Sequence, residues 1–125
     1  MSLDTYFKEI DKALSHPLIR EVHLQKEKRS DHVGLIVAKV TFIDNSELHV
    51  MEYAEVEKTI ERKTYRYHYQ NYRKDMIFRY DNAPHHLGIS TYPHHKHIGA
   101  EIVESHNPNL SDVVSEIVRA IYRSM

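Results

Sequence analysis

Apolar residues recur every three or four positions near both ends of the chain, which is the spacing of one helical face. Near the start, the apolar residues at this spacing are Leu3, Tyr6, Phe7, Ile10 and Leu14. Near the end, they are Leu110, Val113, Val114, Ile117, Val118 and Ile121. The first stripe predicts a helix over residues 3–14 that stops before His16-Pro17. The second predicts a helix that Asn109 or Ser111 caps.

Between the two helices the pattern changes to the alternation and β-branched runs that are typical of strands. The predicted strands cover residues 19–25, 34–43, 47–57, 65–70, 76–81 and 100–104. Asp44-Asn45-Ser46 lies between two of them and predicts a hairpin turn. The order of elements favours an α+β fold: a single antiparallel sheet of four to six strands packed with an N-terminal and a C-terminal helix. Residues 1–125 are expected to form one domain.

The predicted second hairpin separates aromatic from basic side chains. Tyr65, Tyr67 and Tyr69 fall on one face of the strand over residues 65–70, and we assign them to the core. Arg66 and His68 fall on the other face.

A short turn near residue 72 predicts Arg66 beside Arg79, with Asp81 close by on the same face. Two adjacent guanidinium groups favour an anion between them, and their shape suits phosphate. A histidine beside them can supply acid or base catalysis. The other interpretation of this face is a solvated surface in which Arg79 pairs with an acid.

Five of the eleven histidines lie within thirteen residues, at His85, His86, His94, His95 and His97. Two Pro-His-His triplets, which begin at Pro84 and Pro93, contribute four of them. Imidazole ligates metals when neutral and transfers protons near neutral pH. Because proline restricts the backbone, we expect a rigid loop that holds a site.

A metal site is the first alternative for this histidine segment. In a locally extended chain His95 and His97 face the same side, and Asp81, His85 or His86 could complete a zinc or other transition-metal site. No cysteine is present, so thiolate metal sites and disulfides are excluded. A polar loop without any metal is the other interpretation, and it is the one that we favour.

Composition narrows the classes of function. Apolar residues make up 41% of the chain and charged residues 28%, with a formal net charge of −1, as in ordinary globular proteins. Only three glycines are present, and no glycine-rich phosphate loop is among them. No apolar run reaches the length of a membrane span, and the first residues lack the apolar stretch of a signal peptide. A cytoplasmic location is therefore expected.

The motifs of the chain resemble those of the TumE family, small prokaryotic proteins described as toxins of a toxin–antitoxin pair. The resemblance is carried by FRYDNAPHH, by a threonine-aromatic-proline followed by HHKH, by DNSELHV, and by the strand around His68. Its motif positions are Arg79, Asp81, Asn82, Pro84, His85, His86, Pro93, His95 and His97. Leu87-Gly88 follows His86 here, where a second proline is common in the family.

The resemblance implies a toxin whose partner is an antitoxin, a DNA-binding protein encoded by a neighbouring gene. RNA is the expected target, and the basic face supplies the expected mechanism, metal-independent cleavage without a cofactor. The candidate catalytic residues are His85, His86, His95, His97, His68 and Asp81. The candidate substrate-binding residues are Arg66, Arg79, Asn82 and Lys96. The alternatives are a metal-binding protein and a non-enzymatic interaction module, and an edge strand could also pair two copies of the chain.

Overall fold

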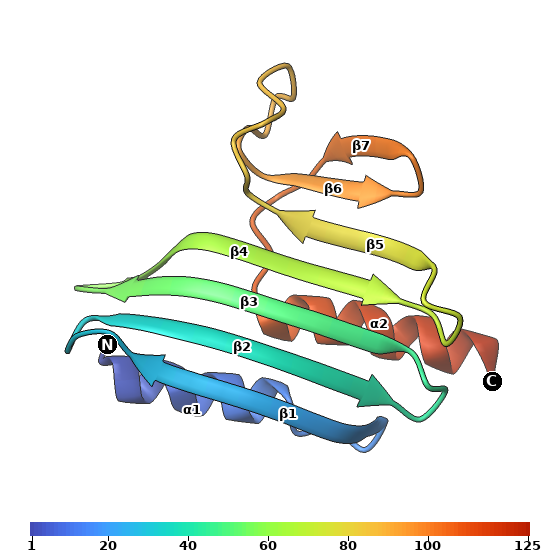
Figure 1. Ribbon diagram of the computed structural model, residues 1–125, viewed down its shortest axis with the longest axis horizontal. Helices are drawn as coiled ribbons and strands as arrows, with labels where there is room; N and C mark the ends of the chain where they lie inside the picture. The colour runs from blue at the N-terminus through green and yellow to red at the C-terminus, as the bar shows by residue number, and fades with distance from the viewer.

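The computed structural model describes residues 1–125 as two helices and seven strands (Figure 1). The elements are α1 (Leu3–Ala13), β1 (Ile19–Lys28), β2 (Val33–Phe42), β3 (Glu47–Val56), β4 (Ile60–Gln70), β5 (Met76–Asp81), β6 (His95–Ile98), β7 (Glu101–Glu104) and α2 (Leu110–Ser124). All seven strands form one antiparallel sheet whose spatial order is the order along the chain. The predicted α+β class is confirmed. The predicted number of four to six strands is wrong.

The additional strand is β6, which lies in a segment for which the sequence predicts no regular structure. Its four residues, His-Lys-His-Ile, alternate imidazole with a long cation and therefore show no apolar pattern. Its pairing with β5 and β7 decides its conformation, and that information is tertiary.

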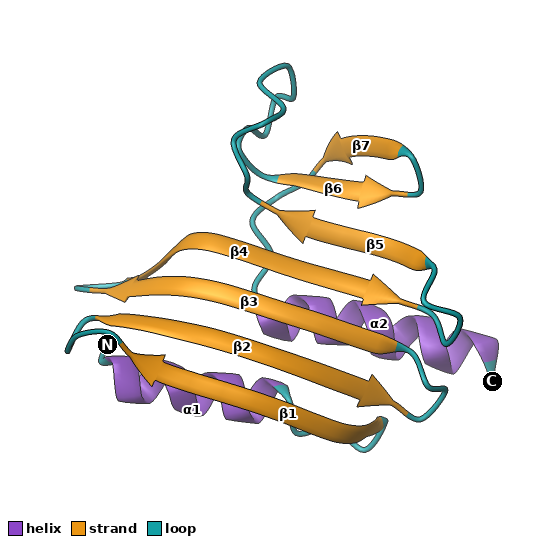
Figure 2. Ribbon diagram, in the orientation of Figure 1, coloured by secondary structure: helices purple, strands orange, loops and turns teal.

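Both helices cover the same face of the sheet, and the other face is open (Figure 2). The core of 25 buried residues lies between these two layers. Tyr65, Tyr67 and Tyr69 belong to it, with exposed fractions of 1%, 0% and 4%. Their predicted assignment to the core is confirmed. Arg66 and His68 therefore lie on the open face.

Side-chain caps define where the helices begin. The Ser2 hydroxyl accepts a hydrogen bond from the Thr5 amide at 3.1 Å, and Asn109 and Asp112 form a reciprocal capping box at the start of α2. Helix α1 packs tightly on β2, since a Cβ atom at Gly34 would lie 2.9 Å from Leu3 Cδ1. Neither helix has the length and apolar character needed to cross a membrane.

The expected pairing of Arg66 with Arg79 is wrong by two residues. Arg66 lies opposite Asp81, and His68 lies opposite Arg79. The connection is longer than predicted, because the Asn71 side chain accepts backbone hydrogen bonds from Arg73 and Asp75 and holds a wider turn. An even shift leaves every side chain on its predicted face. Arg66 therefore lies opposite a carboxylate and not opposite a second arginine, which would repel it.

Candidate active site

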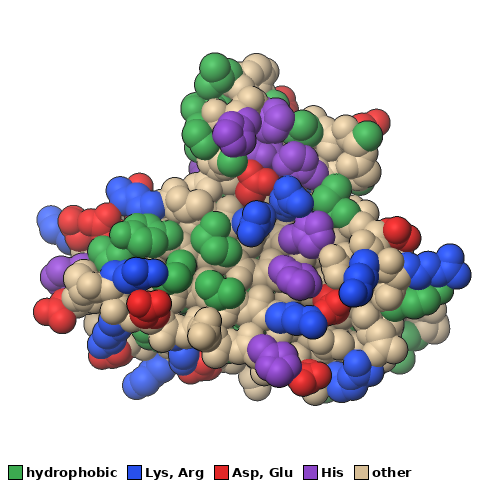
Figure 3. Space-filling view, in the orientation of Figure 1, with side chains coloured by type: hydrophobic (Ala, Val, Ile, Leu, Met, Phe, Trp, Pro, Cys, Tyr) green, Lys and Arg blue, Asp and Glu red, His purple; other side chains and the backbone are tan.

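The open face is hollowed where β5 and β6 meet the loop between them, and this cavity has a volume of about 320 Å³. The residues that line it are Met51, Thr64, Tyr65, Arg66, Arg79, Asp81, Ala83, His85, His86, His95 and His97. Figure 3 shows histidine side chains gathered at this end of the face, with basic side chains beside them. Seven of the ten predicted site residues thus line one cavity.

Strand alternation explains why these side chains share the cavity. Asp81 pairs with His95, and Arg79 pairs with His97, so four polar side chains of β5 and β6 point to the open face. Thr91 holds the preceding loop in place. Its hydroxyl donates to the His94 carbonyl at 2.7 Å and accepts from the Ser105 amide at 3.1 Å, across the start and end of the β6–β7 hairpin.

Asp81 is the centre of the arrangement and is 7% exposed. One carboxylate oxygen, Oδ1, accepts a hydrogen bond from the Ala83 amide at 3.0 Å and lies 2.7 Å from His95 Nε2. The other oxygen, Oδ2, lies 3.3 Å from His97 Nε2. A single carboxylate therefore orients two imidazole rings.

His95 is 2% exposed, and each of its ring nitrogens faces an oxygen acceptor. Nδ1 lies 2.9 Å from the Pro93 carbonyl oxygen, and Nε2 faces Asp81. The ring is therefore held in one orientation, between a backbone carbonyl and the carboxylate.

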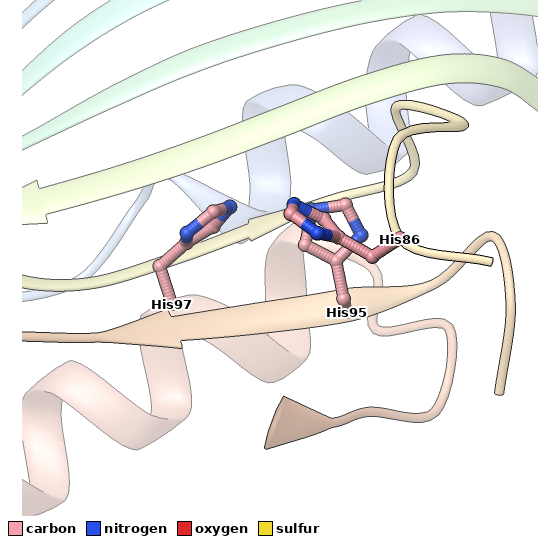
Figure 4. A group of neighbouring side chains, drawn as sticks. All are labelled: His86, His95 and His97. Carbon is pink, nitrogen blue, oxygen red and sulfur yellow. The ribbon is translucent and has the colours of Figure 1, made fainter. Parts of the chain in front are cut away.

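The rings of His86, His95 and His97 point toward one another (Figure 4). Their potential ligand atoms all lie within 4.8 Å of one another, and the ring centroids are 4.7–5.8 Å apart. Three imidazoles at this spacing suit zinc, and Asp81 contacts two of them. The contact of His95 Nδ1 with a backbone carbonyl is also the outer contact that metal-bound histidines make. His85, which the sequence suggested as a ligand, lines the cavity but is not part of this group.

The environment of two histidines favours their neutral forms. Burial lowers the pKa of His97 below its ordinary value of 6.5; Asp81 opposes this shift, and the nearby His95 and Arg79 add to it. Burial also lowers the pKa of His68, and the positive charge of Arg79 acts in the same direction. Arg79 Nε donates to His68 Nδ1 at 3.3 Å. His97 is therefore available as a proton acceptor at neutral pH.

Arg66 and Arg79 both line the cavity, and neither takes part in any of the ion pairs of the structure. Their guanidinium groups thus remain able to bind an anion in the cavity.

Two predicted substrate-binding residues lie outside the cavity. Lys96 points to the helix-covered face, where its ammonium group contacts Glu116 at 2.9 Å and lies 4.6 Å from the centroid of the Tyr80 ring. Asn82 accepts from the Tyr65 amide and donates to the Lys63 carbonyl, both at 3.0 Å. It joins the end of β5 to β4. In a strand, Lys96 faces the side opposite to His95 and His97, so the sequence contained a signal that Lys96 lies away from them.

The sequence did not single out His49 and Met51. Met51 lines the cavity, and the His49 ring lies 6.1 Å from that of His68 across the β3–β4 pair. Their alternation with buried Leu48 and Val50 was a signal that they face away from the core. The register of β3 against β4 was needed to place Met51 opposite Arg66 at the cavity and His49 opposite His68.

A comparison with protein families matches residues 7–125 to the family described as Toxin TumE. Neither a curated protein nor a solved structure was found to match the chain. Because the matched region covers nearly the whole sequence and includes every residue of the cavity, the chain belongs to the TumE toxin family.

Proposed function

We propose that this toxin cleaves RNA by acid–base catalysis in the cavity on the open face, without a metal ion. One observation carries the proposal: the cavity combines two arginines that have no acidic partner with histidines that a buried carboxylate orients. Arginines of this kind bind phosphate, and oriented histidines transfer protons.

The reaction needs two proton transfers and one binding site for negative charge. A base removes the proton of a ribose 2′-hydroxyl, and its oxygen forms a bond to the adjacent phosphorus. The bond from phosphorus to the 5′-oxygen breaks, and an acid gives that oxygen a proton. The products end in a 2′,3′-cyclic phosphate and a 5′-hydroxyl.

The residues of the cavity match these roles. His97 is half-buried and its pKa is lowered, so that it serves as the base. His86 faces the same space from the loop and serves as the acid. Arg66 and Arg79 stabilise the charge on the phosphate in the transition state. Asp81 and the buried His95 are positioning residues, because His95 is too enclosed to reach a substrate.

The proposal includes a partner and a location. A toxin of this kind is held inactive by an antitoxin, and we expect the partner to be a DNA-binding protein encoded by a neighbouring gene. RNA in the cytoplasm is the expected target.

Two adjacent histidines provide a matched test. Purified protein, stripped of metal with EDTA, is incubated with RNA, and the His86→Ala variant is compared with His85→Ala. Only His86 belongs to the converging group, so His86→Ala should lose cleavage and His85→Ala should keep more of it. Intact RNA after incubation with the folded wild type would contradict the proposal. Binding to the neighbouring gene product without cleavage would instead support an interaction module.

The convergence of His86, His95 and His97, two of which contact Asp81, favours a second candidate, a metal centre. In that case these histidines would hold the ion, which would supply a Lewis acid able to activate water or polarise the phosphate. Metal analysis of untagged protein and titration with zinc distinguish the two. One tightly bound equivalent, lost in His86→Ala and kept in His85→Ala, supports the metal centre. Cleavage in EDTA supports the metal-free mechanism.

A further inference from the structure

A line of polar side chains crosses the open face from the cavity to the far edge of the sheet. The strand registers place His97, Arg79, His68, His49, Lys39 and His23 directly opposite one another on six consecutive strands, β6 to β1. We call this set the polar row. Neighbouring strands lie about 4.8 Å apart, so the row is about 24 Å long. That length accommodates several nucleotides of an extended strand.

An apolar patch borders the polar row on β2 and β3. The patch consists of Leu35, Val37, Met51 and Tyr53, which form two directly opposed pairs, Val37 with Met51 and Leu35 with Tyr53. Val37 is 41% exposed and Tyr53 is 40% exposed. Met51 also lines the cavity, so that patch and cavity are continuous. Figure 3 shows hydrophobic side chains on this face next to the basic ones.

We infer that this face binds single-stranded RNA, with unpaired bases on the apolar patch and the sugar–phosphate backbone along the polar row. The inference rests on the proposed function and specifies its substrate class. The patch lies next to the middle of the row, on β2 and β3, and both reach the cavity, so that one strand can contact both. Histidine, lysine and arginine side chains supply the hydrogen-bond donors that phosphates accept.

The exposed apolar groups of this face favour a single strand over a duplex. The patch is part of a sheet surface and offers aromatic and aliphatic groups to stack against. In a double helix the base faces are hidden in the stack, and only unpaired bases can reach such groups. Single-stranded segments are therefore the substrate that this surface accepts.

The two ends of the polar row differ in how strongly they are expected to bind RNA. Near the cavity, Arg79 donates a hydrogen bond to His68 and forms no ion pair. At the far end, Lys39 already contacts Glu47 at 3.1 Å and His23 contacts Glu21 at 2.8 Å. RNA must replace these contacts, so nucleotides close to the cavity contribute most of the affinity.

Binding is measured separately from cleavage with a labelled 2′-O-methyl RNA of about a dozen nucleotides, which lies within typical single-strand site sizes and lacks the attacking hydroxyl. Fluorescence anisotropy should give a Kd that rises roughly five- to a hundredfold in Tyr53→Ala, the usual effect of removing one stacked base. Tyr122→Ala, which removes an exposed tyrosine from α2, is the control and should bind as the wild type does. The same RNA in duplex form should bind more weakly.

A second variant tests the polar row. Lys39→Ala should reduce the slope of log Kd against log salt by about 0.7, the value for one phosphate contact on a single strand. Tyr53→Ala should also lower kcat/KM for long RNA.

The outcomes separate this inference from the proposed function. If folded Tyr53→Ala binds the single strand as tightly as the wild type does, the inference is wrong, even when the wild type cleaves RNA. Loss of a protein partner in Tyr53→Ala with unchanged RNA affinity overturns it as well and identifies a protein interface. If the predicted binding pattern holds and no cleavage occurs, the surface stands and the proposed function fails.

Discussion

Two buried carboxylates, one on each face of the sheet, show how similar burial produces different chemistry. On the helix-covered face, Glu52 is 0% exposed and accepts hydrogen bonds from the hydroxyls of Tyr6 and Tyr67. On the open face, Asp81 is 7% exposed and contacts His95 and His97.

The partners of the two carboxylates make the difference. Burial raises the pKa of Tyr67 well above its ordinary value of 10.0, and the pKa of Tyr6 rises for the same reason. Neither phenol exchanges protons near neutral pH. Imidazole does, because its ordinary pKa lies near 6.5. A buried carboxylate with phenol partners holds the core together, whereas one with imidazole partners can hold a catalytic base.

The largest expected effect separates catalysis from stability on the open face. His97→Gln should lower the rate of RNA cleavage roughly a hundred- to ten-thousandfold, the usual contribution of a general base. The half-buried position of His97 leaves the core intact, so thermal unfolding should stay close to that of the wild type. Measured kcat and circular dichroism check both parts. A variant with full activity would remove His97 from the mechanism.

The opposite outcome is expected for the carboxylate in the core. Glu52→Ala leaves the buried hydroxyls of Tyr6 and Tyr67 without their acceptor, and Arg62 nearby without a counter-charge. The free energy of unfolding should fall by about 2–5 kcal/mol. Urea denaturation measures this loss. The folded fraction should cleave RNA at the wild-type rate, and a slower rate would show that the two carboxylates are coupled.

The pH dependence sharpens the contrast further. His97 must be neutral to accept a proton, and burial lowers its pKa below the ordinary 6.5. Cleavage should therefore persist on acidification past 6.5, the ordinary pKa of histidine, and be lost only at lower pH, where His97 becomes protonated. A pH profile of kcat/KM tests this expectation. An acidic midpoint above that value would mean that another group is the base.

The smallest expected effect concerns Lys96, which lies between His95 and His97 in sequence and on the other face in space. Lys96→Met keeps much of the packing against Phe78 and Tyr80 and removes the contact with Glu116. A single ion pair of this kind contributes about 1 kcal/mol or less. Cleavage should be unchanged in a rate assay. A clear loss of rate would place a charge of the helix-covered face in the reaction.

The sequence predicts the parts of this molecule that depend on local pattern. The two amphipathic stripes give both helices, and the alternation of Tyr65, Tyr67 and Tyr69 gives the face that is buried. The sequence also locates the histidine segment, whose side chains line the cavity beside β5 and β6.

Register and pairing lie beyond the local pattern. The turn held by Asn71 changes the cross-strand partner of Arg66 from Arg79 to Asp81. The sequences of the two strands alone do not predict this change of register. Strand β6 has no apolar alternation and exists because β5 and β7 flank it. The choice of His86 over His85 depends on the course of the loop, for which both residues look alike in the sequence.

The most direct test of the account is the end group that the protein leaves on RNA. A single-stranded RNA is incubated with metal-stripped wild type and, in parallel, with Asp81→Asn, and the products are resolved by mass spectrometry. Metal-free acid–base cleavage predicts fragments with 2′,3′-cyclic phosphate ends from the wild type. Because Asp81 orients His95 and His97, the Asp81→Asn variant should show a large loss of cleavage. Intact RNA, or equal cleavage by a folded Asp81→Asn variant, would contradict the account.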